Sequence, residues 1–126
     1  MVRTAYESLA RRDWEALSRD AHRDFVIHTQ LQGSYRGADA WRRFVEDRTG
    51  TFESWTLEPR GFHPHEDRVE VSLRSRSRLE AVEAVIVMDI SHVWTVRDHA
   101  LFSLHTFARL ADALAAFGRW PFGPGR

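Results

Sequence analysis

The sequence predicts an α+β fold, with helices in the first half of the chain and a series of antiparallel strands in the second. Apolar residues recur at helical spacing near the N-terminus, whereas between residues 52 and 107 they alternate with polar ones at the period of a strand. The chain has 126 residues, of which 43% are hydrophobic and 29% charged, as in an ordinary globular domain. We therefore expect one domain over residues 1–126, with residues 119–126 as a tail.

Two helices are expected at the start of the chain. The first has one apolar stripe with spacing i, i+3, i+4, i+7, formed by Val2, Ala5, Tyr6 and Leu9. The second is short, and Asp13 can cap its N-terminus because a carboxylate accepts hydrogen bonds from the free backbone N–H groups there. The buried side of this second helix is expected to carry Trp14, Leu17 and Ala21.

A strand, a turn and a third helix follow. Residues 24–32 alternate as a strand, with Phe25, Ile27, Thr29 and Leu31 on one face. The segment 33–37 has a glycine at each end and is predicted to be a turn. The third helix is expected to end at Gly50 and to turn inward Ala38, Trp41, Phe44 and Val45.

The second half is predicted to form a meander of four strands and a closing helix. The strands cover residues 52–62, 68–79, 82–96 and 100–107, and the helix ends at Gly118. The third of these strands is almost continuously apolar between Val85 and Met88, so we expect both of its faces to be covered.

Composition excludes several classes of function. The formal net charge is zero, so long-range attraction favours neither nucleic acid nor an anionic membrane surface. The absence of cysteine rules out disulfides, a thiolate nucleophile and Cys-ligated zinc. No apolar run approaches the roughly 20 residues of a membrane span, and residues 1–4 do not open a signal peptide, so a cytoplasmic protein is expected. His63, His65 and Glu66 lack an obvious third and fourth ligand partner, so neither a metal nor another cofactor is expected.

The turn between the last two strands decides which side chains share a face. A two-residue loop, Asp98-His99, needs a positive φ at both residues and suits Asn-Gly better than Asp-His. A three-residue loop, 97–99, needs only one left-handed residue, at His99, and is favoured about two to one on turn chemistry. One face of the hairpin would then be lined by Ile90, His92, Trp94, Phe102, Leu104 and Thr106. The other face would carry Asp89, Ser91, Val93, Ser103 and His105.

The chain resembles the SnoaL-like branch of the nuclear transport factor 2-like superfamily over nearly its whole length. The resemblance rests on four segments, which are Arg12-Asp13 after a helix with Tyr6, the 33–37 segment leading to Trp41 and Phe44, His92 to Asp98, and Asp112 to Leu114. It implies a strongly curved antiparallel sheet wrapped on three to four helices, a cone with an internal apolar pocket. It also implies a homodimer that pairs through the outer sheet face. The fold hosts isomerases, cyclases, epoxide hydrolases, dehydratases and binders, so it does not by itself imply one activity.

The resemblance also locates candidate site residues. Ketosteroid isomerases place an Asp near the position of Thr29, and SnoaL-like cyclases and limonene epoxide hydrolases place one at Thr106. Threonine cannot act as a base near neutral pH, so none of these mechanisms transfers unchanged. The isomerase tyrosine falls at or one residue before Tyr6, and the isomerase's second Asp or the cyclase's His falls at His92.

His92 is the candidate catalytic residue, because an imidazole can donate or accept a proton near neutral pH. The alternative is a core histidine held by a backbone carbonyl or by Tyr6. The candidate substrate-binding residues are Tyr6, Thr29, Trp41, Phe44, Trp55, Trp94, Phe102 and Thr106. Asp89 would be a general base if it faced the pocket, or an interfacial partner of Arg74 or Arg76 if it faced outward.

Two functions remain open from the sequence. The first is proton-transfer chemistry, meaning isomerisation, cyclisation or dehydration, on a small apolar oxygenated molecule inside the cone. The second is a non-catalytic module that binds a small molecule or dimerises through its sheet. The loss of both family aspartates favours the second function, whereas His92 inside the predicted pocket favours the first.

Overall fold

The computed structural model describes residues 1–30, 33–49, 54–79 and 83–117. The described helices are α1 (Val2–Ala10), α2 (Trp14–Asp20), α3 (Ala40–Thr49) and α4 (Leu110–Phe117). The described strands are β1 (Ala21–His28), β2 (Ser34–Arg36), β3 (Ser54–His65), β4 (Arg68–Leu79), β5 (Ala84–Arg97) and β6 (Ala100–Phe107). The predicted ends at Gly50 and Gly118, like Leu31, lie outside the described residues.

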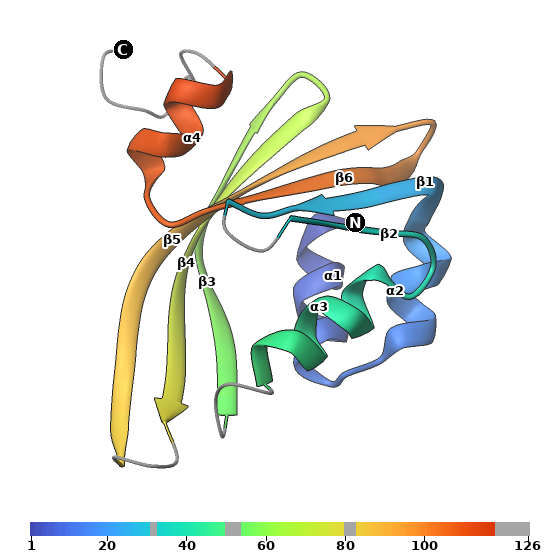
Figure 1. Ribbon diagram of the computed structural model, residues 1–126. Helices are drawn as coiled ribbons and strands as arrows, with labels where there is room; N and C mark the ends of the chain where they lie inside the picture. Colours follow the sequence, from blue (N-terminus) through green and yellow to red (C-terminus); the bar gives the residue numbers. More distant parts are fainter. Residues whose placement is uncertain (31–32, 50–53, 80–82, 118–126) are drawn as a thin grey trace.

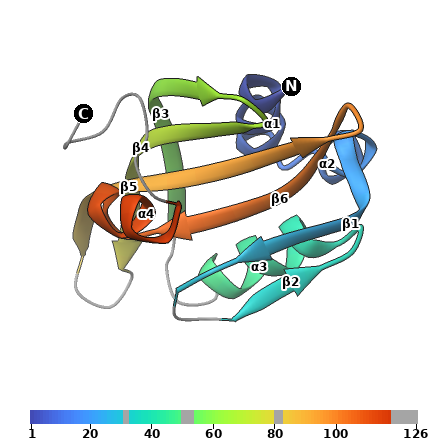
Figure 2. The same cartoon turned by 90° about the horizontal axis from the view of Figure 1, so that it is seen from above.

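The strands form one strongly curved sheet in the order β2-β1-β6-β5-β4-β3. Helices α1, α2 and α3 lie on its concave side and α4 lies on the other side (Figure 1; Figure 2 shows the sheet from above). The predicted α+β class is therefore confirmed, but the sheet is mixed, because β1 runs parallel to β6. Strand β6 follows β5 as an antiparallel neighbour and lies beside β1, which runs in the same direction as β6.

Most residues of the apolar stripes predicted for the helices supply the core, but Ala38 is exposed and precedes α3, and Ala21 begins β1. All four stripe residues of α1 are buried, and Leu17 of α2 is 1% exposed. The Asp13 carboxylate accepts a hydrogen bond from the Ala16 amide at 3.1 Å, as expected of a capping residue. In α3, Trp41, Phe44 and Val45 are buried against the concave face of the sheet.

The turn predicted at 33–37 is wrong, and so are the bounds predicted for the strand before it. The segment 33–37 contains the short edge strand β2, which pairs antiparallel with β1, and the glycines at its ends have φ values of 78° and 97°. Strand β1 begins at Ala21 and ends at His28, where the Thr29 amide turns to donate to the Gly33 carbonyl. Residues 33–37 were predicted as a turn because three strand residues between two glycines are too few to show a period.

The apolar run of β5 is not covered on both faces. Val85, Ile86, Val87 and Met88 are 58%, 38%, 47% and 47% exposed. This end of β5 pairs with β4 but extends beyond the helices (Figure 1). The prediction assumed a covering layer on each face, and the described helices do not cover this end of the strand. Among the described residues, no helix has the length and hydropathy needed to cross a membrane.

The loop between β5 and β6 has two residues, so the favoured three-residue loop is wrong. Arg97 pairs with Ala100, and Asp98 and His99 have φ values of 54° and 60°. The register then shifts by one residue at Phe102, so that Val96 pairs with Leu101 and Thr95 with Ser103. Beyond this bulge the side chains again point to the predicted faces, although the paired residues differ from those of a three-residue loop.

The predicted faces are therefore confirmed beyond the bulge. His92 pairs with Thr106 and Trp94 with Leu104, which places them on the inner face, and Asp89 lies on the outer face. Phe102 is the exception, because Leu101 takes the inward position and is fully buried.

Candidate functional site

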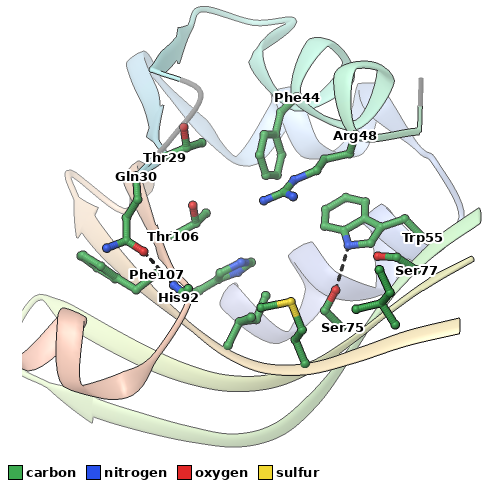
Figure 3. A pocket seen from close by; sticks show the side chains of 14 residues that line it. Thr29, Gln30, Phe44, Arg48, Trp55, Ser75, Ser77, His92, Thr106 and Phe107 are labelled. Atoms are coloured by element: carbon green, nitrogen blue, oxygen red, sulfur yellow. Dashed lines mark hydrogen bonds between the residues drawn. The ribbon is translucent and has the colours of Figure 1, made fainter. Parts of the chain in front are cut away.

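A cavity of about 310 Å³ lies between the C-terminal half of α3 and the concave face of β3, β4 and β5. Residues near the ends of β1 and β6 close one side of it (Figure 3). Its lining is formed by Thr29, Gln30, Phe44, Arg48, Trp55, Ser75, Ser77, Ile86, Met88, Ile90, His92, Thr106, Phe107 and Ala108. None of these described lining residues is acidic.

Five of the nine predicted site residues line this cavity, namely Thr29, Phe44, Trp55, His92 and Thr106. They come from the segment after β1, from α3 and from three strands of the sheet, so the fold brings together residues far apart in the sequence.

The other four predicted residues lie elsewhere. Tyr6 and Trp94 are buried and do not line the cavity. Tyr6 is hydrogen-bonded to His92, and Trp94 to Tyr6. Trp41 packs in the core, 5.5 Å from the Trp94 ring centroid. Phe102 lies in the bulge near the hairpin end, where the Arg97 guanidinium is 4.0 Å from its ring centroid. The sequence prediction for Phe102 assumed a hairpin without a bulge.

A hydrogen-bonded chain of three buried side chains sets the state of His92. The indole N–H of Trp94 donates to the Tyr6 hydroxyl at 2.8 Å, and the same hydroxyl is 2.8 Å from Nδ1 of His92. Among the described residues, Nδ1 of His92 is the one hydrogen-bond acceptor within reach of the Tyr6 hydroxyl, so the Tyr6 proton is assigned to this bond. The remaining nitrogen of His92, Nε2, then carries the ring proton of the neutral imidazole.

Burial keeps the Tyr6 and His92 side chains of this hydrogen-bonded series neutral. Burial and, as a smaller cause, the positive charge of Arg48 together lower the pKa of His92 to about 3. Burial likewise raises the pKa of Tyr6 well above its usual value. His92 is thus a hydrogen-bond donor at neutral pH and a poor general base. Of the roles expected from the sequence, hydrogen-bond donation fits this state and general-base catalysis does not.

Arg48 is the charged residue of the cavity that the sequence prediction missed. It is partly buried, and its guanidinium points into the cavity from α3 between Phe44 and Trp55 (Figure 3). Its carbon Cζ is 5.7 Å from the Phe44 ring centroid and 5.8 Å from that of Trp55. Burial lowers the pKa of Arg48, but an arginine remains charged.

The sequence contained signals for Arg48 and for two serines of the cavity. Trp41, Phe44 and Arg48 are spaced i, i+3 and i+7, so Arg48 continues the inward stripe of α3. In the Arg-Ser-Arg-Ser-Arg run of β4, the arginines and serines alternate at strand period, which places Ser75 and Ser77 inward.

Two polar groups are oriented by neighbours so that they offer donors to the cavity. Ser75 accepts the indole N–H of Trp55 at 3.0 Å, so its own hydroxyl proton is left to donate. The side-chain oxygen of Gln30 accepts from the Ala108 amide at 2.8 Å, which leaves its NH₂ group as a donor. The cavity therefore presents an excess of donors over acceptors.

The titratable groups outside the cavity do not contribute to it. Asp89 is exposed on the outer face and pairs with Arg74 of its own chain at 3.1 Å. His63 contacts the buried Glu70 carboxylate at 2.8 Å. Within the described ranges, no cluster of three or more His, Cys, Asp or Glu side chains could hold a metal ion.

The sequence and the fold are similar to those of known proteins. The SnoaL-like domain model matches residues 2–104. Among curated proteins, none matches the chain in sequence.

Three solved structures illustrate the likeness in fold. TerC, co-crystallised with polyporic acid, is 20% identical, with a TM-score of 0.75 and coverage of 90% of this chain and 92% of TerC. A protein of ketosteroid isomerase-like fold from Catenulispora acidiphila, in complex with trimethylamine, is 13% identical, with a TM-score of 0.74 and coverage of 91% and 90%. The epoxide hydrolase/cyclase-like enzyme SalBIII, which has a role in pyran ring formation in the polyether salinomycin, is 17% identical, with a TM-score of 0.70 and coverage of 88% and 89%. At these identities the likeness shows the fold alone.

Proposed function

Because the chain belongs to the SnoaL-like domain family, we propose that its cavity binds a small, mostly apolar, oxygenated molecule and that His92 polarises an oxygen of that molecule. The observation that carries this proposal is the Trp94–Tyr6–His92 chain, which leaves the Nε2–H of a neutral histidine as a donor. A donor held in place by buried neighbours is arranged in advance for a developing negative charge on a carbonyl oxygen.

The size and lining of the cavity support a small apolar ligand. A volume of about 310 Å³ lies at the lower end of the range for small-molecule sites. Phe44, Trp55 and Ile90 supply apolar surface, while Thr106 stands opposite His92 in the β5–β6 pair. TerC and the C. acidiphila protein were both crystallised with small molecules, which agrees with this use of the fold.

The chemistry that fits these groups is proton transfer next to a carbonyl, in an isomerisation, cyclisation or dehydration. His92 stabilises the enolate oxygen by donating from Nε2, and Tyr6 and Trp94 position the ring without touching the substrate. The described lining contains no carboxylate, so the proton is taken from carbon by water or by a basic group of the substrate itself.

A second candidate function is binding without catalysis, because the positions of the family carboxylates are occupied by Thr29 and Thr106. Ligand binding is common to both functions and is tested first.

The outer face, where Val85 and Val87 are exposed, is where we expect two copies to pair, and sedimentation velocity would detect that dimer.

The experiment compares two substitutions of His92. His92→Asn keeps an oxygen near the place of Nδ1, so Tyr6 retains an acceptor, but it removes the Nε2–H donor. His92→Gln keeps an amide N–H near the place of Nε2. Thermal-shift screening with polyketide-like and steroid-like ketones identifies ligands, and calorimetry then measures their affinity.

We expect His92→Asn to weaken the binding of a ketone ligand by about tenfold, the worth of one good hydrogen bond, and His92→Gln to weaken it less. His65→Leu, at an exposed position in β3, is the control and should leave affinity unchanged. Equal affinities for wild type and His92→Asn would remove His92 from the site. The absence of any ligand in the screen would contradict the proposal as a whole.

A further inference from the structure

Arg48 brings a positive charge into the cavity that no described acidic side chain pairs with. Arg48 has neither an ion pair nor a hydrogen bond within the part of the chain that the structure describes, and its buried Nε has no acceptor. The other described arginines of α3 do form ion pairs, Arg42 with Glu46 at 2.8 Å and Arg43 with Asp39 at 3.1 Å. A guanidinium N–H that is buried without an acceptor is costly, and a ligand that supplies the acceptor removes this cost.

A purely structural role does not account for this arrangement. The rings of Phe44 and Trp55 attract the cation through their faces, but the centroid distances of 5.7 and 5.8 Å lie near the outer limit for such contacts. The ring faces also leave the in-plane N–H donors of the guanidinium without acceptors. These donors form a fork that matches two oxygens of a carboxylate.

The surroundings of Arg48 favour an anion rather than a neutral acceptor. The described lining has no carboxylate, so no negative charge in it competes for Arg48. The Ser75 oxygen accepts a hydrogen bond from the Trp55 indole, so its hydroxyl proton is available to a ligand. The buried Ser77 lies two residues further along the same strand. The field of Arg48 also reaches His92, whose pKa it lowers, so it acts across the cavity.

We propose that Arg48, together with Ser75 and Ser77, binds a carboxylate of the ligand, so that the natural substrate class is a small apolar carboxylic acid with a second oxygen that reaches His92. This inference rests on the proposed binding of a ligand in the cavity. It also orients the ligand in that site, with its acid group at the α3 side and its carbonyl at the His92 side (Figure 3).

The test uses matched pairs of probes that differ only in charge. Benzoate, 2-naphthoate and 9-anthroate are compared by calorimetry with their primary amides, which have the same shape and no charge. The variants are Arg48→Met, which keeps an apolar stem against Phe44 and Trp55, and Arg48→Lys, which keeps the charge and loses the fork. Arg42→Met on the exposed side of α3 is the matched control.

We expect the carboxylates to bind wild type at least about tenfold more tightly than the amides. That preference should vanish in Arg48→Met, be partly kept in Arg48→Lys and remain intact in Arg42→Met, while the affinity for the amides stays unchanged. Amides that bind as well as carboxylates would overturn the anion site and leave the proposed function standing. A lack of binding by every probe, together with an empty ketone screen, would overturn both.

Discussion

The state of His92 is set by contacts that no local pattern reveals. Its residue type and its place on an inward strand position could be read from the sequence. Its proton position could not, because that depends on Tyr6, which is 86 residues away and is itself fixed by Trp94. Arg48 shows the same limit. Its helical spacing can be read from the sequence, but the lack of an acidic partner among the described residues cannot.

The buried neutral His92 predicts a definite dependence of stability on pH. Its pKa is about 3 in the folded chain and near 6.5 in the unfolded chain. Above pH 6.5 it is neutral in both states and adds no slope. As the pH falls below 6.5 the unfolded chain binds a proton that the folded chain does not, so the free energy of unfolding decreases.

We expect the free energy of unfolding, measured with urea, to fall between pH 6 and pH 5 more steeply in wild type than in His92→Asn. The difference in slope should reach up to about 1.4 kcal/mol per pH unit. His105, whose pKa burial lowers to about 4, is present in both chains and cancels in the comparison. Identical slopes would mean that His92 titrates in the folded protein as it does in the unfolded chain, and would contradict the lowered pKa.

At the scale of elements, the sequence and the conformation of the β5–β6 hairpin disagree at two successive loop residues. Asp98 and His99 both adopt a positive φ, a conformation that costs an L-residue about 1–2 kcal/mol. His99→Gly removes this cost at the second position but adds flexibility to the unfolded chain, worth about 0.5–1 kcal/mol. Asp98 is kept, because its carboxylate lies 3.6 Å from His22.

We expect His99→Gly to raise the free energy of unfolding by about 0.5–1 kcal/mol. His65→Gly is the control, since the same change in the regular strand β3 should lower it. Thermal or urea unfolding of both variants measures the difference. Destabilisation by His99→Gly as large as that by His65→Gly would show that His99 is not strained.

The same hairpin shows how far sequence patterns reach for elements. Turn chemistry favoured a three-residue loop, which is wrong. The faces beyond residue 102 are right because a bulge at Phe102 shifts the pairing by one residue and restores the predicted alternation of faces. Long periodic elements such as α1 and β4 were predictable because burial imposes their spacing. The edge strand β2 and the bulge were not, because both depend on pairing with distant strands.

At the scale of the whole molecule, curvature creates the site. The far ends of β3, β4 and β5 extend beyond the helices, and α3 stands off them enough to leave the cavity. The family resemblance predicted this cone, but periodicity alone could not, because strand patterns carry no information on how far a sheet bends. The mixed order of the sheet, with β1 parallel to β6, likewise follows from packing between distant segments.

The most direct test of the central claim is a long-range ¹H–¹⁵N NMR spectrum of histidine-labelled protein, recorded from pH 8 to pH 5 with and without a ketone ligand. We predict that His92 remains neutral throughout, with its proton on Nε2, and that this proton alone among the histidine signals shifts downfield when the ligand binds. A His92 signal that titrates near pH 6.5, or that carries its proton on Nδ1, would contradict the account.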